Sequence, residues 1–302
     1  LKHPRRWPVL GEPAAFDCLT RQDVLDYHAS RYVPNNVVLS IAGDVDAAEI
    51  FSHLELLVED LKSRPLNREL IPHEPHQFGS RRVRKEFAVP YSKLNLAWRL
   101  PCSGHPDTPA LSALASILGG GRSARFYEKF HDRLGLVYSI EVHSNQSETD
   151  EGAFTISIDV DRAQRDKVRD LVLQELRNLA QEDFTEDLKR VCKQTRVSRL
   201  RRRSSAAGVA SEMGADWFGA RNLNLSSEWQ EAIERVTTED LHRVCSTWLS
   251  SPNVTEVSLD PVGSNAAEED GSAAGTETAL SEHVLGNGMK VVIRSEEHTS
   301  EL

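Results

Sequence analysis

The sequence predicts an α+β fold in which antiparallel sheets are each packed with helices. Residues 94–100 and 154–160 alternate apolar and polar side chains, as strands with one buried face do. Residues 111–118 carry an apolar stripe at helical spacing between these strands. In addition, residues 19–45 align without a gap on residues 236–262, which indicates two duplicated domains.

Composition limits the class of protein. The chain has 302 residues, enough for two domains, and its 39% hydrophobic and 27% charged residues are ordinary for a globular protein. A net charge of -10 argues against a nucleic-acid partner, and no apolar run approaches the roughly 18 residues of a membrane helix. The four cysteines show no Cys-x-x-Cys spacing, so reduced thiols are expected.

Residues 1–64 contain a helix, a strand and a second helix. Thr20 and Asp23 have the spacing of a capping box, which predicts a helix to about Tyr32. Residues 37–42 form a short apolar run typical of a buried strand, and Asp46 is suited to cap the next helix. Residues 65–79 contain three prolines without periodicity and are predicted to be a linker.

Residues 80–262 have the pattern of a complete α+β domain. Strands are expected at 83–89, 94–100, 136–143 and 154–160. A short helix from Ser123 to about Asp132, with Ser123 as its cap, precedes the third of these strands. Helices are expected at 168–179, 185–202, 205–218 and 237–248, and Cys245 lies on the apolar stripe of the last as small apolar filler.

Gly119, Gly120 and Gly121 end the apolar stripe of the 111–118 helix. Glycine adopts positive φ without steric cost, so three of them predict a structural turn at the helix C-terminus. The alternative is a cradle for an anion. We favour the turn, because the stretch has neither a P-loop lysine nor the Gly-x-Gly-x-x-Gly pattern.

The alignment of residues 19–45 with residues 236–262 places similar residues opposite each other. Thr20 aligns with Thr237, and Asp23 aligns with Asp240. A duplication explains a register that needs no gap over the whole span. Shared capping patterns between unrelated helix-strand units are the alternative.

The last part of the chain changes in character. Residues 263–279 are rich in Gly, Ser, Ala and Glu, as flexible hinges are. Residues 280–293 contain Asn287-Gly288, a hairpin-type turn between apolar segments. Residues 294–302 match the translation of a common sequencing adapter and are interpreted as an artifact, with a native polar tail as the alternative.

The order of helix, glycine turn, short helix and strand resembles the second domain of the pitrilysin/insulinase-like (M16) zinc metallopeptidases. The matching stretches are Gly119–Ser123, His131–Tyr138, the segment from His3 to Gly11 and Leu285–Val291. The resemblance implies a processing-peptidase-like fold, also similar to LuxS. Residues 1–64 would then be the C-terminal remainder of a first domain, and residues 280–293 the start of a second peptidase unit.

The resemblance also implies zinc-assisted peptide hydrolysis by a His-x-x-Glu-His helix. None of the eleven histidines has that spacing. His73 and His76 are three apart, but Pro75 between them is incompatible with helical ligand geometry. The catalytic residues and the Zn²⁺ of the full-length protein are therefore expected upstream of Leu1, with no metal held by this fragment.

In some halves of such peptidases an Arg and a Tyr seven residues apart contact the substrate carbonyl. Tyr138 occupies the Tyr position and His131 the Arg position, where imidazole cannot replace a guanidinium fork. They are weak candidates for substrate binding. A core role for Tyr138 is favoured, because it falls on the apolar side of the 136–143 strand with Ile140.

The function implied by the resemblance is zinc metallo-endopeptidase activity on extended peptides held between two halves, with this fragment alone inactive. The expected partners are a peptide substrate and a second peptidase half, in the same chain or as a partner subunit. A noncatalytic structural or presequence-binding subunit is the alternative. A third hypothesis is an unrelated anion-binding protein that uses the glycine turn.

Overall fold

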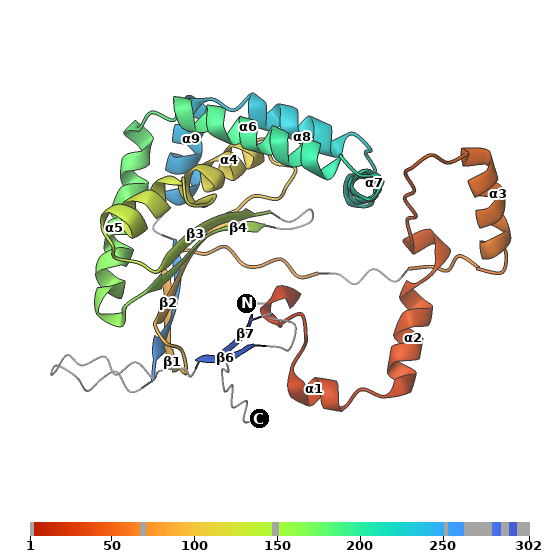
Figure 1. Cartoon of the computed structure of the whole chain (residues 1–302), viewed down its shortest axis with the longest axis horizontal. Helices are drawn as coiled ribbons and strands as arrows, with labels where there is room; N and C mark the ends of the chain where they lie inside the picture. The colour runs from red at the N-terminus through yellow and green to blue at the C-terminus, as the bar shows by residue number, and fades with distance from the viewer. Residues whose placement is uncertain are drawn as a thin grey trace. The chain divides into compact units, whose positions relative to one another are not determined.

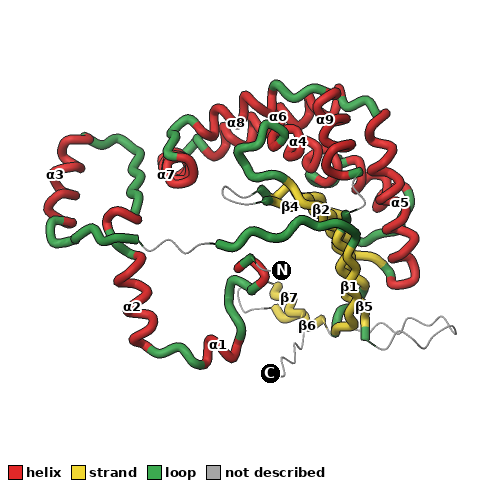
Figure 2. The backbone as a smooth tube through the Cα atoms, turned by 180° about the vertical axis from the view of Figure 1, so that it is seen from behind, coloured by secondary structure: helices red, strands yellow, loops and turns green. Residues whose placement is uncertain are grey.

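A five-stranded sheet packed against a layer of helices dominates the computed structural model, which describes residues 3–66, 71–146, 151–250, 253–262, 280–284 and 290–294. Residues 1–262 form one compact unit and residues 263–302 a second, and each is considered by itself. The predicted α+β class is confirmed in the first unit (Figures 1 and 2).

The sheet has the strand order β1-β5-β2-β4-β3. Its strands are β1 (Arg81–Phe87), β2 (Ser92–Leu100), β3 (Ser139–Asn145), β4 (Gly152–Val160) and β5 (Thr255–Pro261). The β2–β4, β3–β4 and β2–β5 pairs are antiparallel, as predicted, whereas β1 pairs with β5 in parallel. A short connection joins β1 to β2 and reverses the chain. Because β5 lies between them and runs antiparallel to β2, it must run parallel to β1, and the sheet is mixed.

Strand register gives the sheet two different faces. Leu94 lies opposite Ile158 and Leu96 opposite Ile156, and all four are at most 1% exposed. The residues between them, such as Asn95 and its partner Ser157, are polar and only partly buried. Since directly paired residues share a face, the apolar side chains gather on one side and leave the other side open.

Helices cover the apolar face. They are α4 (Thr108–Gly119), α5 (Arg165–Asn178), α6 (Thr185–Arg202), α7 (Ala206–Ala220), α8 (Leu225–Glu234) and α9 (Thr238–Val244), with the π-helices η3 (Tyr127–Arg133) and η6 (Cys245–Leu249) and the 3-10 turns η4 (Arg162–Gln164) and η5 (Leu179–Gln181). Figure 1 shows α4, α6, α8 and α9 on the same side of β3 and β4. None of the helices in the described ranges is long and apolar enough to cross a bilayer.

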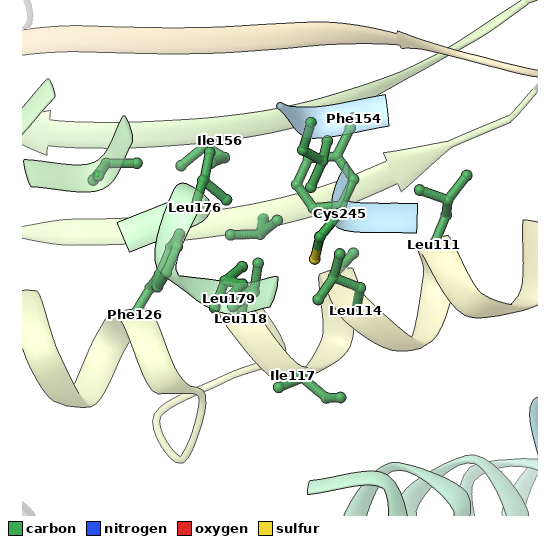
Figure 3. Close-up of a cluster of buried hydrophobic side chains, with 14 of the residues drawn as sticks. Leu111, Leu114, Ile117, Leu118, Phe126, Phe154, Ile156, Leu176, Leu179 and Cys245 are labelled. Atoms are coloured by element: carbon green, nitrogen blue, oxygen red, sulfur yellow. The ribbon is translucent and has the colours of Figure 1, made fainter. Parts of the chain in front are cut away.

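The core lies between α4 and the sheet. Leu111 and Leu114 of α4 point toward Phe154 of β4, and all three are fully buried (Figure 3). Burial of one such side chain stabilises the fold by about 1.5–3 kcal/mol. Cys245 of η6 belongs to the same cluster, and burial raises the pKa of its thiol to about 12. It therefore stays protonated at neutral pH and acts as apolar filler, as predicted.

The short helix before β3 differs from the expected one. Its helical residues begin at Arg125, and its π-helical part η3 spans Tyr127–Arg133. Ser123 lies in the turn before Ala124, the residue that precedes the helix, so the prediction of Ser123 as a cap is wrong. Phe126 and Phe130 are 1% exposed, belong to the core cluster and contact each other in a T-shaped arrangement of their rings. Packing of these rings fixes the helix in place of a cap.

A cluster of ion pairs joins α5 to strand β5 of the sheet. The Arg165 guanidinium pairs with the Asp260 carboxylate of β5, and both side chains are less than a tenth exposed. Ser92 donates a hydrogen bond to Asp260 at 2.6 Å. Burial alone would raise the pKa of Asp260, but hydrogen bonds from Ser92 and Arg165 hold it below its ordinary value. The carboxylate is therefore ionised at neutral pH and ties α5 to β5.

Residues 3–66 form short helices without a strand. They are η1 (Pro4–Arg6), α1 (Pro13–Asp17), α2 (Arg21–Arg31), η2 (Pro34–Asn36) and α3 (Ala47–Val58). The predicted strand at 37–42 is wrong: Val37 is extended, but the described residues provide no strand to pair with this segment. None of α1, α2 and α3 contains a buried residue, so side chains such as Leu25 and Leu57 remain exposed.

The two segments aligned by the repeat share their capping geometry. Thr20 begins α2 and Thr237 begins α9, and each forms a reciprocal capping box with the aspartate three residues later, Asp23 or Asp240. They differ downstream, because only the second segment continues into a paired strand, β5. Duplication of the whole domain stays a prediction.

In the second unit, β6 (Leu280–Val284) and β7 (Lys290–Arg294) pair antiparallel. The predicted turn at Asn287-Gly288 and the predicted hinge at 263–279 lie outside the described residues, as do residues 295–302 of the predicted artifact.

Candidate functional site

Tyr138 lies directly before β3 and is accessible. The residue is 54% exposed, so the prediction of a core tyrosine is wrong. The alternation that buries Ile140 and Val142 stops at Ser139, where the strand begins. The Tyr138 hydroxyl donates a hydrogen bond to Asp161 Oδ1 at 2.8 Å, and its ring lies 5.2 Å from that of Tyr91.

The hydrogen bond to Asp161 and the carboxylate charge raise the pKa of Tyr138 above its ordinary value. The phenol therefore remains a proton donor across the neutral range. It could donate to a carbonyl oxygen only by giving up Asp161, because a hydroxyl has a single proton.

His131 lies on η3 and does not join Tyr138. Its ring stacks on Tyr127, with centroids 4.4 Å apart, and its Nδ1 is 2.7 Å from Asp132 Oδ1. Within the described ranges no hydrogen bond or ring contact links His131 to Tyr138. The structure therefore places the two predicted residues in separate hydrogen-bond groups.

The glycine turn brings α4 close to β3. A Cβ on Gly119 would lie 2.3 Å from the backbone nitrogen of Val142, and one on Gly120 would lie 2.4 Å from Ser116 O. Gly121 has open space but a φ of +103°. Close backbone approach requires glycine at the first two positions, and a positive φ favours it at the third, so all three have structural roles in the turn.

The open face of the sheet is polar along β2, β3 and β4. Asn95 Nδ2 donates to Ser157 Oγ at 2.8 Å, and Lys93 Nζ lies 3.3 Å from Asp159 Oδ1. At one end of this face the guanidinium of Arg99 donates to the backbone oxygens of residues 74 and 75. The linker is thereby fastened to β2.

A metal site is not formed by the part of the chain that the structure describes, where no three His, Cys, Asp or Glu side chains come together. His76 instead makes a T-shaped contact with the ring of Phe78. These donors do not fit a zinc ion, so we assign no zinc chemistry to them.

The arginines at the end of α6 are exposed except for Arg199, which is half-buried, and three of them pair with acidic side chains of neighbouring helices. Arg199 and Arg203 both pair with Glu212 of α7, at 3.0 and 2.7 Å, and Arg196 pairs with Glu234 of α8 at 2.9 Å. The acidic partners come from α7 and α8, so sequence spacing within α6 does not show these pairs.

One pocket was missed by the sequence analysis. It has a volume of about 610 Å³, lies between the sheet and α5, and is lined by residues that include Arg82, Trp98, Leu173, Arg177, Leu249 and Glu256. The alternation of β2 predicts that Trp98 faces the helices, but the partners that surround it come from β1, β5 and α5. Only tertiary pairing brings them together.

Comparisons with known proteins agree with this geometry. The family model described as "Peptidase M16 inactive domain" matches residues 19–194. The zinc protease PqqE of Helicobacter pylori is 25% identical over 86% of this chain, which covers 59% of that protein. A probable mitochondrial-processing peptidase subunit beta of Arabidopsis thaliana is 20% identical over 84% of the chain and half of its own length.

Solved structures show the same fold. The crystal structure of a protease from Helicobacter pylori superimposes with a TM-score of 0.76 at 24% identity, over 86% of this chain and 63% of that one. The peptidase M16 inactive domain from Pseudomonas fluorescens gives a TM-score of 0.71 at 20% identity, over 83% and 60%. The chain thus spans about three fifths of the first relatives that it matches.

Proposed function

The chain belongs to the M16 peptidase family and carries its inactive domain, and on this premise we propose that it forms one wall of a peptidase chamber that cleaves extended peptides. The match over residues 19–194 is the observation that carries the proposal. We propose that the zinc ion implied by the names of the relatives is bound outside this chain; among the described residues no suitable set of ligands comes together.

The open, polar face of the sheet supports the role of a chamber wall. Asn95, Ser157 and Thr155 present amide and hydroxyl groups that can pair with an extended peptide. We place the exposed hydroxyl of Tyr138 at the border of this surface as a weak substrate contact. His131 has a smaller part in the proposal, since its ring is already engaged with Tyr127 and Asp132.

We further propose that residues 1–64 complete a first domain with sequence outside the chain, and that residues 280–293 begin a second peptidase unit. The exposed apolar side chains of α2 and α3 support the first part, because apolar surface of this kind is normally covered. The second peptidase half would come from the same polypeptide or from a partner subunit.

The test compares this chain with the full-length protein that contains it. An internally quenched peptide should be cleaved by the full-length protein, cleavage should stop when a chelator removes zinc, and this chain alone should leave the peptide intact. Hydrolysis by this chain alone would contradict the proposal.

A noncatalytic subunit of the same fold is the second candidate, favoured by the inactive type of the matched domain and by the processing-peptidase relative. It predicts a full-length protein that does not cleave the peptide by itself but forms a complex with an active M16 subunit. Size-exclusion chromatography of the mixture, followed by the same cleavage assay, separates the two candidates.

A further inference from the structure

We propose that the pocket between the sheet and α5 binds an apolar group that ends in a carboxylate, with the C-terminal residue of a peptide as its ligand. The choice of a peptide rests on the proposed function, whereas the chemistry of the site comes from the pocket itself. The pocket lies on the helix side of the sheet, so it would take the end of a peptide that is not held on the open face. Its volume of about 610 Å³ falls within the roughly 300–1,000 Å³ of small-ligand sites.

The inner surface of the pocket is apolar. Trp98 of β2, Leu176 of α5 and Leu249 of η6 line it and are at most 4% exposed in their own packing. Leu173 and Val254 complete this surface from α5 and the start of β5. An aliphatic or aromatic side chain that entered the pocket would lose contact with water on several of its sides. Removal of apolar surface from water is the main source of affinity in such sites.

The rim of the pocket is cationic. Arg81, Arg82 and Arg177 line it, and Glu256 is the only acidic residue among the lining residues. Arg82 uses its Nε to bind Glu256 Oε2 at 2.9 Å, and no contact of its terminal amino groups is among the hydrogen bonds found within the described ranges. Arg177 forms no hydrogen bond or ion pair with the described part of the chain.

Glu256 does not cancel this charge. Its carboxylate is engaged by Arg82 at 2.9 Å and lies 3.5 Å from Arg84 and 3.7 Å from Arg169, which pair more closely with Asp166 and Asp170. Glu256 is also buried, at 3% exposure, on the helix side of β5. Glu256 is thus used by Arg82, and an anion at the rim meets the positive charge of Arg177, which no acid of the described residues balances. Guanidinium groups bind carboxylates with favourable geometry.

These two features together define the ligand class. A phosphate alone would use the rim and leave the apolar surface empty, and a neutral apolar molecule would leave the arginines without a partner. The last residue of a peptide carries an apolar side chain and a carboxylate within one residue's length. A free fatty acid has the same two groups and is the other source of this chemistry.

The test measures binding of a fluorescent peptide that ends in Leu-Leu with a free carboxylate, by anisotropy, to the intact protein in the presence of a chelator. Loss of the carboxylate in the C-terminal amide should weaken binding about tenfold or more, as expected for a charge-assisted contact. Arg177→Gln should do the same, and Arg177→Lys should fall between. Arg201→Gln, an exposed arginine on α6, is the matched control and should leave affinity unchanged.

Equal affinity for acid and amide, or equal affinity of the Arg177→Gln and Arg201→Gln proteins, would overturn the proposal. Competition by dodecanoate that depends on Arg177 would extend the ligand class to fatty acids and support the site. Peptide binding is measured without zinc, so it is independent of cleavage. A full-length protein that cleaves peptides but does not bind the fluorescent peptide would contradict the pocket proposal alone. A full-length protein that binds the fluorescent peptide but cleaves nothing would contradict the peptidase function and support the pocket proposal.

Discussion

Replacement of Gly119 by alanine tests the close approach of α4 and β3. The added Cβ would lie 2.3 Å from the nitrogen, 2.6 Å from Cβ and 2.7 Å from Cγ2 of Val142. These distances are about 1 Å shorter than ordinary contacts, and the nearest atom belongs to backbone that is paired with β4. The end of α4 must then move, although Ile117 and Leu118 fix it in the core with no exposed surface.

We expect Gly119→Ala to lower the free energy of unfolding by about 3 kcal/mol, the upper end for overpacking, because backbone cannot give way as a side chain does. For a unit of this size the melting temperature should fall by about 6–12 °C. Urea unfolding followed by circular dichroism measures the change, with an unchanged m-value as evidence that only stability is altered.

Two matched variants separate steric overlap from backbone strain. Gly104→Ala adds a methyl group in open space and should change stability by less than about 0.5 kcal/mol. Gly121→Ala also meets no atom, but its φ of +103° should cost about 1–2 kcal/mol. If Gly119→Ala were as stable as Gly104→Ala, α4 and β3 would not approach as described and the reasoning would be refuted.

Three further predictions concern titration, ion pairing and metal content. The hydrogen bond to Asp161 raises the pKa of Tyr138. The bond therefore stabilises the fold at pH values below the pKa of an unfolded tyrosine, and this stabilisation is lost as the pH rises through the pKa of Tyr138 in the folded state. Tyr138→Phe should remove one phenol that ionises late from an ultraviolet pH titration. Asp260→Asn should lower the free energy of unfolding by about 3 kcal/mol at neutral pH, because it leaves the buried Arg165 with only the half-exposed Asp166 as counter-charge. The lowered pKa of Asp260 means that its stabilisation is lost as pH falls through that value, so acid denaturation curves of variant and wild type should converge at low pH. Mass spectrometry of the purified chain should find zinc well below one equivalent, and a stoichiometric ion that resists dialysis would contradict the placement of the metal elsewhere.

Features of the fold that depend on neighbours in sequence could be predicted. Residues 94–100 and 154–160 alternate strictly, and the alternation alone identifies β2 and β4 and their buried faces. The Thr20 and Thr237 capping boxes were also readable, because each depends on two residues three apart.

Features of the fold that depend on residues distant in the sequence could not be predicted. The segment 37–42 has the composition of a strand, yet a strand exists only where a second one offers hydrogen bonds. Tyr138 continues the alternation of β3 by sequence, but the strand begins one residue later. The pocket is formed by residues of β1, β2, β5, α5 and η6, so no local sequence pattern predicts that Arg177 lines it.

The insertion of β5 between β1 and β2 has a consequence for biosynthesis. The ribosome synthesises β1 and β2 long before residues 255–261. The two earlier strands therefore remain without the strand that pairs between them until β5 has been made. Contacts of such large sequence separation slow folding, and a nascent chain stopped short of Thr255 would have nothing to hold β1. Pausing, truncation or proteolysis in that window should therefore be the point at which this protein is most vulnerable to aggregation.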